Sequence, residues 1–330
     1  MLQYIIRRVL LAIPLLFVIS LISYMVIELP PGDYLVQYVA SIENATGQRL
    51  TEDEIAQLRA LYGLDRPIYA RYLRWIWNFL RGNLGRSFQH NRPVSELLAE
   101  RIPLTIAITM VAMVFSWVIA IPIGIFSAVR QYSVFDYIFT TFGFIGLATP
   151  SFLLALVVMW ISFSQFGFSA SGLFSSDYID APWSWARFVD LLKHLPVPAL
   201  IIGIGGTAWL IRIMRGNLLD ELRKPYVTTA RAKGLAETRL LTKYPVRIAI
   251  NPLISTIGWT LPQLFSGSTL VAIVLNLQTV GPVLFHALLS QDMYVAGSIL
   301  LILSALTVIG TLISDILLAW VDPRIRLGGG

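Results

Sequence analysis

The sequence predicts an all-α membrane protein with about six transmembrane helices, and three observations lead to that fold class. Hydrophobic residues make up 56% of the 330 residues, and charged residues only 13%, against about 25% in ordinary soluble chains. The apolar residues fall in long uncharged runs. The basic residues lie between these runs, whereas a nucleic-acid-binding protein would gather them on one face beside aromatic side chains.

Each predicted span rests on length, because a membrane-crossing helix needs about 20 mostly apolar residues. The first follows Arg7 and Arg8 and resembles a signal peptide. Its uncharged run of 19 residues is longer than usual for a signal peptide, and no small-x-small cleavage site follows it. We therefore expect an uncleaved span there. The expected spans are 9–28, 103–129, 138–164, 195–213, 250–275 and 294–318.

Small residues and prolines interrupt these runs. Gly124, Gly143 and Gly203 lie where a missing side chain lets helices approach closely. Pro150 lies inside the third expected span and predicts a kink there. Close helix packing is the expectation for the glycines, and lining of a transport pathway is the alternative.

The spans divide the chain into four parts. We expect an N-terminal transmembrane helix at 1–28, an external (periplasmic) helical loop at 29–101, a five-helix core at 102–318 that includes a cytoplasmic loop at 212–247, and a cytoplasmic tail at 319–330.

The charges between the spans predict the orientation. The set on the side of both termini carries a net charge of +8 and the opposite set −2, which together give the chain's +6. Basic residues concentrate in cytoplasmic loops. We therefore expect both termini of this multi-pass protein to be cytoplasmic, and the 212–247 loop contributes most to that prediction.

The external loop contains two predicted helices. Thr51 and Glu54 form a capping box for the first, which Gly63 can end. The second, from about 67 to 81, has one apolar stripe, made of Ile68, Tyr72, Trp75 and Phe79. Its Trp and Arg content suits the membrane interface. Packing on the outer rim of the membrane domain is the expectation, and a substrate-delivery surface is the alternative.

Several kinds of chemistry find no support in the sequence. The chain has no cysteine, and its three histidines lie far apart, so metal sites and thiol catalysis are not expected. The middles of the spans are nearly free of ionisable residues, which ion-coupled carriers usually use. A phosphate-binding G-x-x-x-x-G-K-[ST] loop is also absent. We expect a non-catalytic subunit whose energy comes from a partner.

The basic loop between the fourth and fifth spans offers a docking element for such a partner. After Lys224-Pro225, residues 226–233 predict a short helix that Gly234 ends with a left-handed cap, and Pro245 interrupts a second helix. Small residues beside cations on the first helix would let it sink into a groove of another protein. The alternative is a polybasic loop that rests on anionic lipid.

The chain resembles a known family at several points in order. The opening "MLQYIIRRVLLAIPLLFVISLISYMVIELPPGD", the stretch "GLDRPIYARYLRWIWNFLRGNLGRSF", "ATPSFLLAL", "YVTTARAKGLAETRLL" followed by "NPL", and the closing "LLAWVDPRIR" are similar to ABC importer permeases of the dipeptide/oligopeptide class. These are inner-membrane components of binding-protein-dependent transport systems. The resemblance covers essentially the whole chain and implies the type I ABC importer permease fold.

The resemblance implies a function that works by alternating access. The chain would pair with a second related permease and two ATPase subunits, and a periplasmic substrate-binding protein would deliver peptides or similar small oligomers. ATP and Mg would bind the ATPases, not this chain. The residues that match the family's ATPase-coupling helix are Ala230, Arg231, Ala232, Lys233 and Gly234, while Thr228 stands where the general family motif has Glu.

The substrate is less defined by the resemblance. The subclass often has P-G-L-G after the fifth span, where this chain reads "LQTVGPVLF", and a branch resembling this variant is associated with oligosaccharides. Polar residues in apolar surroundings, Thr260, Gln263 and Asn276, are candidates to line the substrate path. An ion-coupled carrier and a membrane enzyme or scaffold without a transport role are the alternative functions.

Overall fold

The computed structural model of the chain describes residues 2–28, 35–36, 39, 49, 51–62 and 65–321. Within its helices, the side chains of 2–5, 7–8, 26–27, 61–62, 258–267 and 317–321 lie outside that description. Helices dominate the described residues, and their one β-type pairing is an isolated bridge between Arg86 and Pro93. The prediction of an all-α protein is confirmed.

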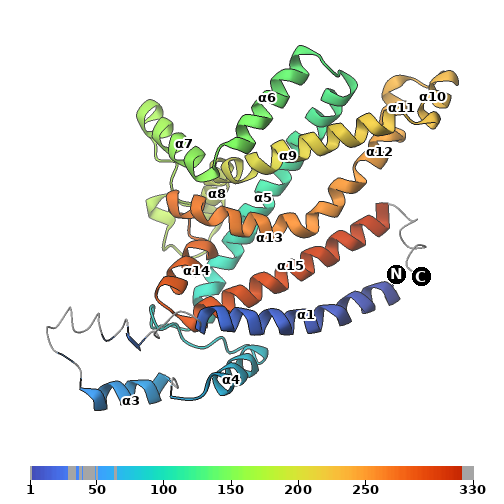
Figure 1. The fold of residues 1–330 in the computed structure, drawn as a ribbon. Coiled ribbons are helices and arrows are strands. Elements are labelled where there is room, and N and C mark those ends of the chain that lie inside the picture. Colours follow the sequence, from blue (N-terminus) through green and yellow to red (C-terminus); the bar gives the residue numbers. More distant parts are fainter. Residues whose placement is uncertain are drawn as a thin grey trace. The chain divides into compact units, whose positions relative to one another are not determined.

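The chain forms two compact units, and Figure 1 shows the helices of each. The first unit comprises Met1–Leu104 and Thr279–Leu306, and the second Thr105–Gln278 and Thr307–Gly330. The helices that begin in the first unit are α1 (Leu2–Glu28), α3 (Glu52–Tyr62), α4 (Ile68–Leu80), α5 (Val94–Val129), α14 (Val280–Leu289) and α15 (Met293–Val321). Those of the second unit are α6 (Val134–Ala148), α7 (Ser151–Phe166), η1 (Ser176–Tyr178), α8 (Trp185–His194), α9 (Pro196–Leu222), α10 (Pro225–Ala232), α11 (Glu237–Lys243), α12 (Pro245–Ala249) and α13 (Asn251–Val274).

Three of the described helices are long and apolar enough to cross a membrane. They are α5, α9 and the Met293–Ile316 part of α15, and they correspond to the spans expected at 103–129, 195–213 and 294–318. Helix α9 continues nine residues beyond the expected end of its span, to Leu222. The loop expected from residue 212 therefore begins as an extension of the helix.

The third expected span is not one helix. Helices α6 and α7 meet at an angle of 104°, and together they could supply a fourth crossing. The break lies at Thr149, whose backbone is extended with φ −87° and ψ 121°, because a residue that precedes a proline is sterically pushed away from helical geometry. The prediction of a single helix at 138–164 is wrong, and the kink expected at Pro150 is a complete break.

The first and fifth expected spans correspond to α1 and α13. Within α1, the described apolar stretch Val9–Met25 is shorter than the three spanning helices. Its large apolar side chains are exposed on nearly every side, for example Leu10 at 60% and Ile13 at 61%, which is typical of a helix surrounded by lipid. The count of six spans stays a prediction.

Close contact between α5 and α9 organises the second unit. Ser116 of α5 donates a buried hydrogen bond of 2.9 Å to the carbonyl oxygen of Gly203. A Cβ atom on Gly124 would lie 2.7 Å from Cβ of Met214, so only glycine fits there. Small residues thus bring these helices together, as the sequence predicted for Gly124 and Gly203.

The predicted capping box is present at the start of α3 in the first unit. The Thr51 backbone N–H donates to Glu54 Oε2 at 2.8 Å, and the Glu54 N–H donates to Thr51 Oγ1 at 3.4 Å. Gly63, the expected end of that helix, lies outside the described residues. In α4, Tyr72 and Trp75 are buried as expected, but Ile68 is 54% exposed because it precedes the part of the helix that packs on the unit.

We predict that Gly124→Ala destabilises the protein by about 1–3 kcal/mol, because the added methyl group must displace the root of a packed side chain rather than its flexible end. The thermal unfolding midpoint in detergent measures the effect. Gly216→Ala on α9 is the matched control, since a Cβ there meets nothing within 4 Å. Equal midpoints for the two variants would contradict the close packing of α5 on α9.

Candidate functional site

Three short helices follow the end of α9, and we call residues 225–249 the loop segment. Helices α10, α11 and α12 lie close together there (Figure 1). Pro225 and Pro245 occupy first-turn positions of α10 and α12, where a missing N–H costs nothing and the fixed φ favours the helix. The predicted helix at 226–233 and the predicted interruption at Pro245 are confirmed.

Gly234 ends α10 in the predicted way. Its φ is +75°, in the left-handed region that glycine tolerates best. The Gly234 N–H donates to the carbonyl oxygen of Arg231 at 2.9 Å, and the Leu235 N–H donates to that of Ala230 at 3.3 Å. These bonds satisfy carbonyl groups at the end of the helix and turn the chain toward α11.

An ion pair closes the turn on its outer side. Arg231 Nη2 lies 2.5 Å and Nε 3.1 Å from the two carboxylate oxygens of Glu237. The hydrogen bond from Arg231 lowers the pKa of Glu237 below its ordinary value, so the carboxylate stays charged at neutral pH. Sequence reasoning took Arg231 as a cation for a partner and missed this pair, because a six-residue spacing across a glycine turn matches no helical pattern.

Buried side chains hold α10 and α11 in place. An isolated helix of eight residues is unstable in water, but Val227 of α10 and Leu240 of α11 are both fully buried at 0% exposure. Tyr226 also donates a 2.5 Å hydrogen bond to Glu221, near the end of α9. Burial is the main cause that raises the pKa of Tyr226, and the hydrogen bond to Glu221 raises it further. The hydroxyl therefore keeps its proton and remains a donor.

Within the loop segment, helix α12 makes the connection to the core of the second unit. Val246 and Ala249 belong to one cluster of buried residues with Met214 and Leu218 of α9. The Asn217 side-chain amide donates to the carbonyl oxygen of Ala249 at 3.3 Å. A force on the loop segment would therefore act on the end of α9 through packed side chains rather than through a loose connection.

The predicted coupling residues lie together on the exposed part of this structure. Arg231, Ala232, Lys233 and Gly234 are exposed, and Ala230 is partly buried. Ala232 is an exposed small residue, and apart from Gly234 and its two chain neighbours no protein atom lies within 4 Å of the position that a Cβ on Gly234 would take. Another protein could approach this backbone closely, with Lys233 at the edge of the contact.

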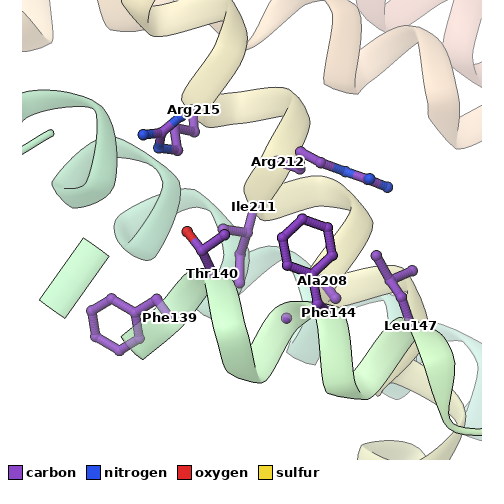
Figure 2. Close-up of a pocket in the computed structure, with 9 residues that line it drawn as sticks. Phe139, Thr140, Phe144, Leu147, Ala208, Ile211, Arg212 and Arg215 are labelled. Carbon is purple, nitrogen blue, oxygen red and sulfur yellow. The ribbon is translucent and has the colours of Figure 1, made fainter. Parts of the chain in front are cut away.

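A groove between α6 and α9 lies beside the part of α9 that precedes the loop segment, and it encloses about 160 Å³. In Figure 2, Arg215 and Arg212 of α9 point in opposite directions. Arg215 pairs with the buried Asp136 of α6 through bonds of 3.0 and 2.9 Å, and the Arg212 guanidinium lies 5.9 Å from the Phe144 ring centre. The groove is lined by Phe139, Thr140, Gly143, Phe144, Leu147, Ala208, Ile211, Arg212 and Arg215.

The Asp136–Arg215 pair connects α6 to the part of α9 that carries the loop segment. Sequence reasoning missed it because the two residues are 79 positions apart. Removing Arg215 would leave the buried Asp136 carboxylate without its ionic partner, which destabilises this contact. The start of α6 is therefore held to α9 and should follow its movement.

Of the candidate substrate-path residues, the structure describes only the side chain of Asn276, and it lies away from this site. The side chains of Thr260 and Gln263 lie outside the described residues. Asn276 has φ +51° just beyond the end of α13, a position where asparagine often ends a helix. Helix α13 separates it from α12 by 24 residues, about 36 Å at 1.5 Å per residue. A role of these three residues in the pathway stays a prediction.

The described residues hold no group of three or more His, Asp or Glu side chains that could bind a metal ion.

Comparison with known proteins assigns the chain to a family. Residues 120–327 match the family described as binding-protein-dependent transport system inner membrane component, and residues 1–109 match the N-terminal region of such membrane components. The oligopeptide transport system permease protein AppB of Bacillus subtilis is 34% identical over 99% of this chain and 100% of its own length.

Two further relatives have the same extent. The inner membrane ABC transporter permease protein YejB of Escherichia coli O157:H7 is 32% identical over 99% of both chains. The oligopeptide transport system permease protein OppB of Haemophilus influenzae is 30% identical over 99% of this chain and 100% of its own. The apolar helices agree with a multi-pass inner membrane protein. The chain belongs to the family of binding-protein-dependent transport system inner membrane components and is the membrane permease subunit of such an importer.

Proposed function

We propose that residues Ala230–Gly234 are the surface on which an ATPase subunit docks, and that this contact drives import. One observation carries the proposal: the exposed end of α10 belongs to a segment whose other side is built into the core around α9. A surface that only rested on lipid would need charge but no rigid connection to a spanning helix.

The connection suggests how ATP would drive transport. Closure of an ATPase dimer would push α10 and, through α12, the end of α9. Helix α6 would follow through the Asp136–Arg215 pair, and α5 through its close contact at Gly124. A coordinated shift of these helices is what alternating access between two membrane faces requires.

The proposed assembly has several chains. This permease would pair with a second related permease and two ATPases that bind ATP and Mg, and a periplasmic binding protein would deliver the substrate. The chain itself would bind no nucleic acid and carry no cofactor. Since the relatives are named for oligopeptide transport, peptides are the proposed substrate class, with oligosaccharides second. Thr260, Gln263 and Asn276 are the candidates for the substrate path.

We predict that Gly234→Glu abolishes import, because a bulky acid on the docking surface would hold the ATPase away. The left-handed backbone itself costs a non-glycine residue about 1–2 kcal/mol. Gly82→Glu is the matched control, since Gly82 also has a positive φ, of +79°, and nothing within 4 Å of an added Cβ. The measurement is substrate uptake by reconstituted complexes, together with ATP hydrolysis stimulated by the loaded binding protein.

The Gly234→Glu variant should insert normally and lose both uptake and stimulated hydrolysis, while Gly82→Glu retains them. Normal uptake with Gly234→Glu would exclude the docking role of this surface. Equal losses in the two variants would trace the defect to backbone strain rather than to docking.

We propose that the loop segment and both termini face the cytoplasm. The native chain has no cysteine, so a single introduced cysteine reports its own position. In intact cells, a cysteine at position 233 (Lys233→Cys) should resist a membrane-impermeant thiol reagent and react after permeabilisation. Asp180→Cys, in an exposed position between the third and fourth expected spans and therefore on the opposite side of the membrane, should react at once. The reverse pattern would invert the orientation.

A further inference from the structure

Helix α4 has more apolar surface than the first unit covers. Tyr72 and Trp75 are buried on one face. A second stripe, spaced three or four residues apart and hence on one face of the helix, stays exposed. It consists of Tyr69 at 70%, Leu73 at 59%, Trp77 at 56% and Leu80 at 73%. We call these four residues the outer stripe. A soluble protein rarely leaves such a stripe to water.

The buried face of α4 fixes its position beside two apolar helices of the same unit. Tyr72 and Ser20 of α1 share a hydrogen bond of 2.8 Å between their hydroxyl groups. The Tyr24 ring meets the Tyr72 ring edge-on at 5.5 Å. Trp75 packs so closely on Gly297 of α15 that a Cβ there would lie 2.9 Å from its ring. In Figure 1, α4 runs beside the C-terminal half of α1.

These contacts place α4 at the level of the membrane. Ser20 and Tyr24 lie inside the uncharged run of α1 that ends at Ile27, roughly 10 and 5 Å from that end at 1.5 Å per residue. Glu28, the first charge after the run, pairs with Arg71 of α4 at 2.5 Å. Amphipathic helices that lie in a bilayer interface bury their apolar face to about 5–10 Å, which matches these positions.

The exposed apolar surface of α1 continues at this level. Ile22 and Met25 are 55% and 59% exposed, so the apolar surface of α1 persists beside the residues that hold α4. The outer stripe of α4 extends the exposed apolar surface of the same unit.

The third face of α4 is polar. Arg74 is exposed there, and Arg81, just after the helix, places its guanidinium 4.5 Å from the Trp77 ring centre. An arginine beside a tryptophan is suited to the boundary between lipid tails and head groups, because its stem can lie along apolar surface while its charge reaches phosphate or water. Helix α4 thus combines a protein-packed face, an apolar exposed face and a cationic face.

We propose that α4 is an interfacial helix whose outer stripe inserts into the phospholipid leaflet at the end of α1. Lipid fits better than a protein partner because the helix is fixed at the depth of the uncharged run of α1 and carries cations at its polar edge. The inference requires only that the apolar helices span a membrane. It does not depend on which side the termini face or on what is transported.

Spin labels on single cysteines test this inference in the assembled complex, reconstituted in vesicles of phosphatidylethanolamine and phosphatidylglycerol. Leu73→Cys labels the outer stripe, and Arg74→Cys is the matched control on the polar face one residue away. The chain itself has no cysteine, and wild-type complex treated in the same way measures labelling of the other subunits. Collision rates with oxygen, which concentrates in lipid, and with a water-soluble nickel chelate report the surroundings of each label.

The proposal predicts that the ratio of the oxygen collision rate to the nickel-chelate collision rate is several-fold higher for the label at position 73 than for the label at position 74. Similar ratios at the two positions would show that the stripe faces water and would overturn the proposal. Protection at 73 from both reagents would show that protein covers the stripe, which also overturns it. Leu80→Cys, on the same stripe, replaces Leu73→Cys if that variant fails to assemble.

Discussion

The packing of α12 against the end of α9 is the contact on which the proposed mechanism depends. A helix of eight residues such as α10 cannot hold its shape alone, and exposed charges such as Arg231 and Lys233 cannot transmit a force unless they are fixed. Val246 and Ala249 supply the fixed point through their burial with Met214 and Leu218. The loop segment is thereby a rigid extension of a spanning helix. Without that burial it would be a basic loop that could bind lipid but could move nothing.

From this point, two different interactions carry the connection into the rest of the second unit. The contact between α9 and α5 is steric, since glycines bring the helices so close that a methyl group does not fit at Gly124. The contact between α9 and α6 is electrostatic, through Asp136 and Arg215. Packed cores and buried ion pairs resist small deformations and favour discrete alternative arrangements. Movement at the end of α9 would thus reach α5 and α6 through two different kinds of contact.

Much of this fold could be predicted from sequence, because local rules determine helices and caps. The left-handed cap at Gly234 and the capping box at Thr51 follow from backbone sterics and short-range hydrogen bonds. The Asp136–Arg215 and Arg231–Glu237 pairs could not be predicted, since their spacings follow no helical period. The break at Pro150 was recognised only as a kink, because apolar content alone does not distinguish one long helix from two. The outer stripe of α4 was missed because exposure depends on which of two apolar faces the rest of the unit covers.

The central claim is that the exposed end of α10 contacts an ATPase. A photo-activated crosslinking amino acid at Ala232 tests it most directly, with irradiation of native membranes and identification of the captured chain by mass spectrometry. The same residue at Thr238, which is exposed on α11, shows how far the contact extends. The account predicts that position 232 captures one ATPase subunit, and that ATP and a phosphate analogue change the yield. Capture of phospholipid alone at position 232 would contradict it and would make the loop segment a lipid-binding surface.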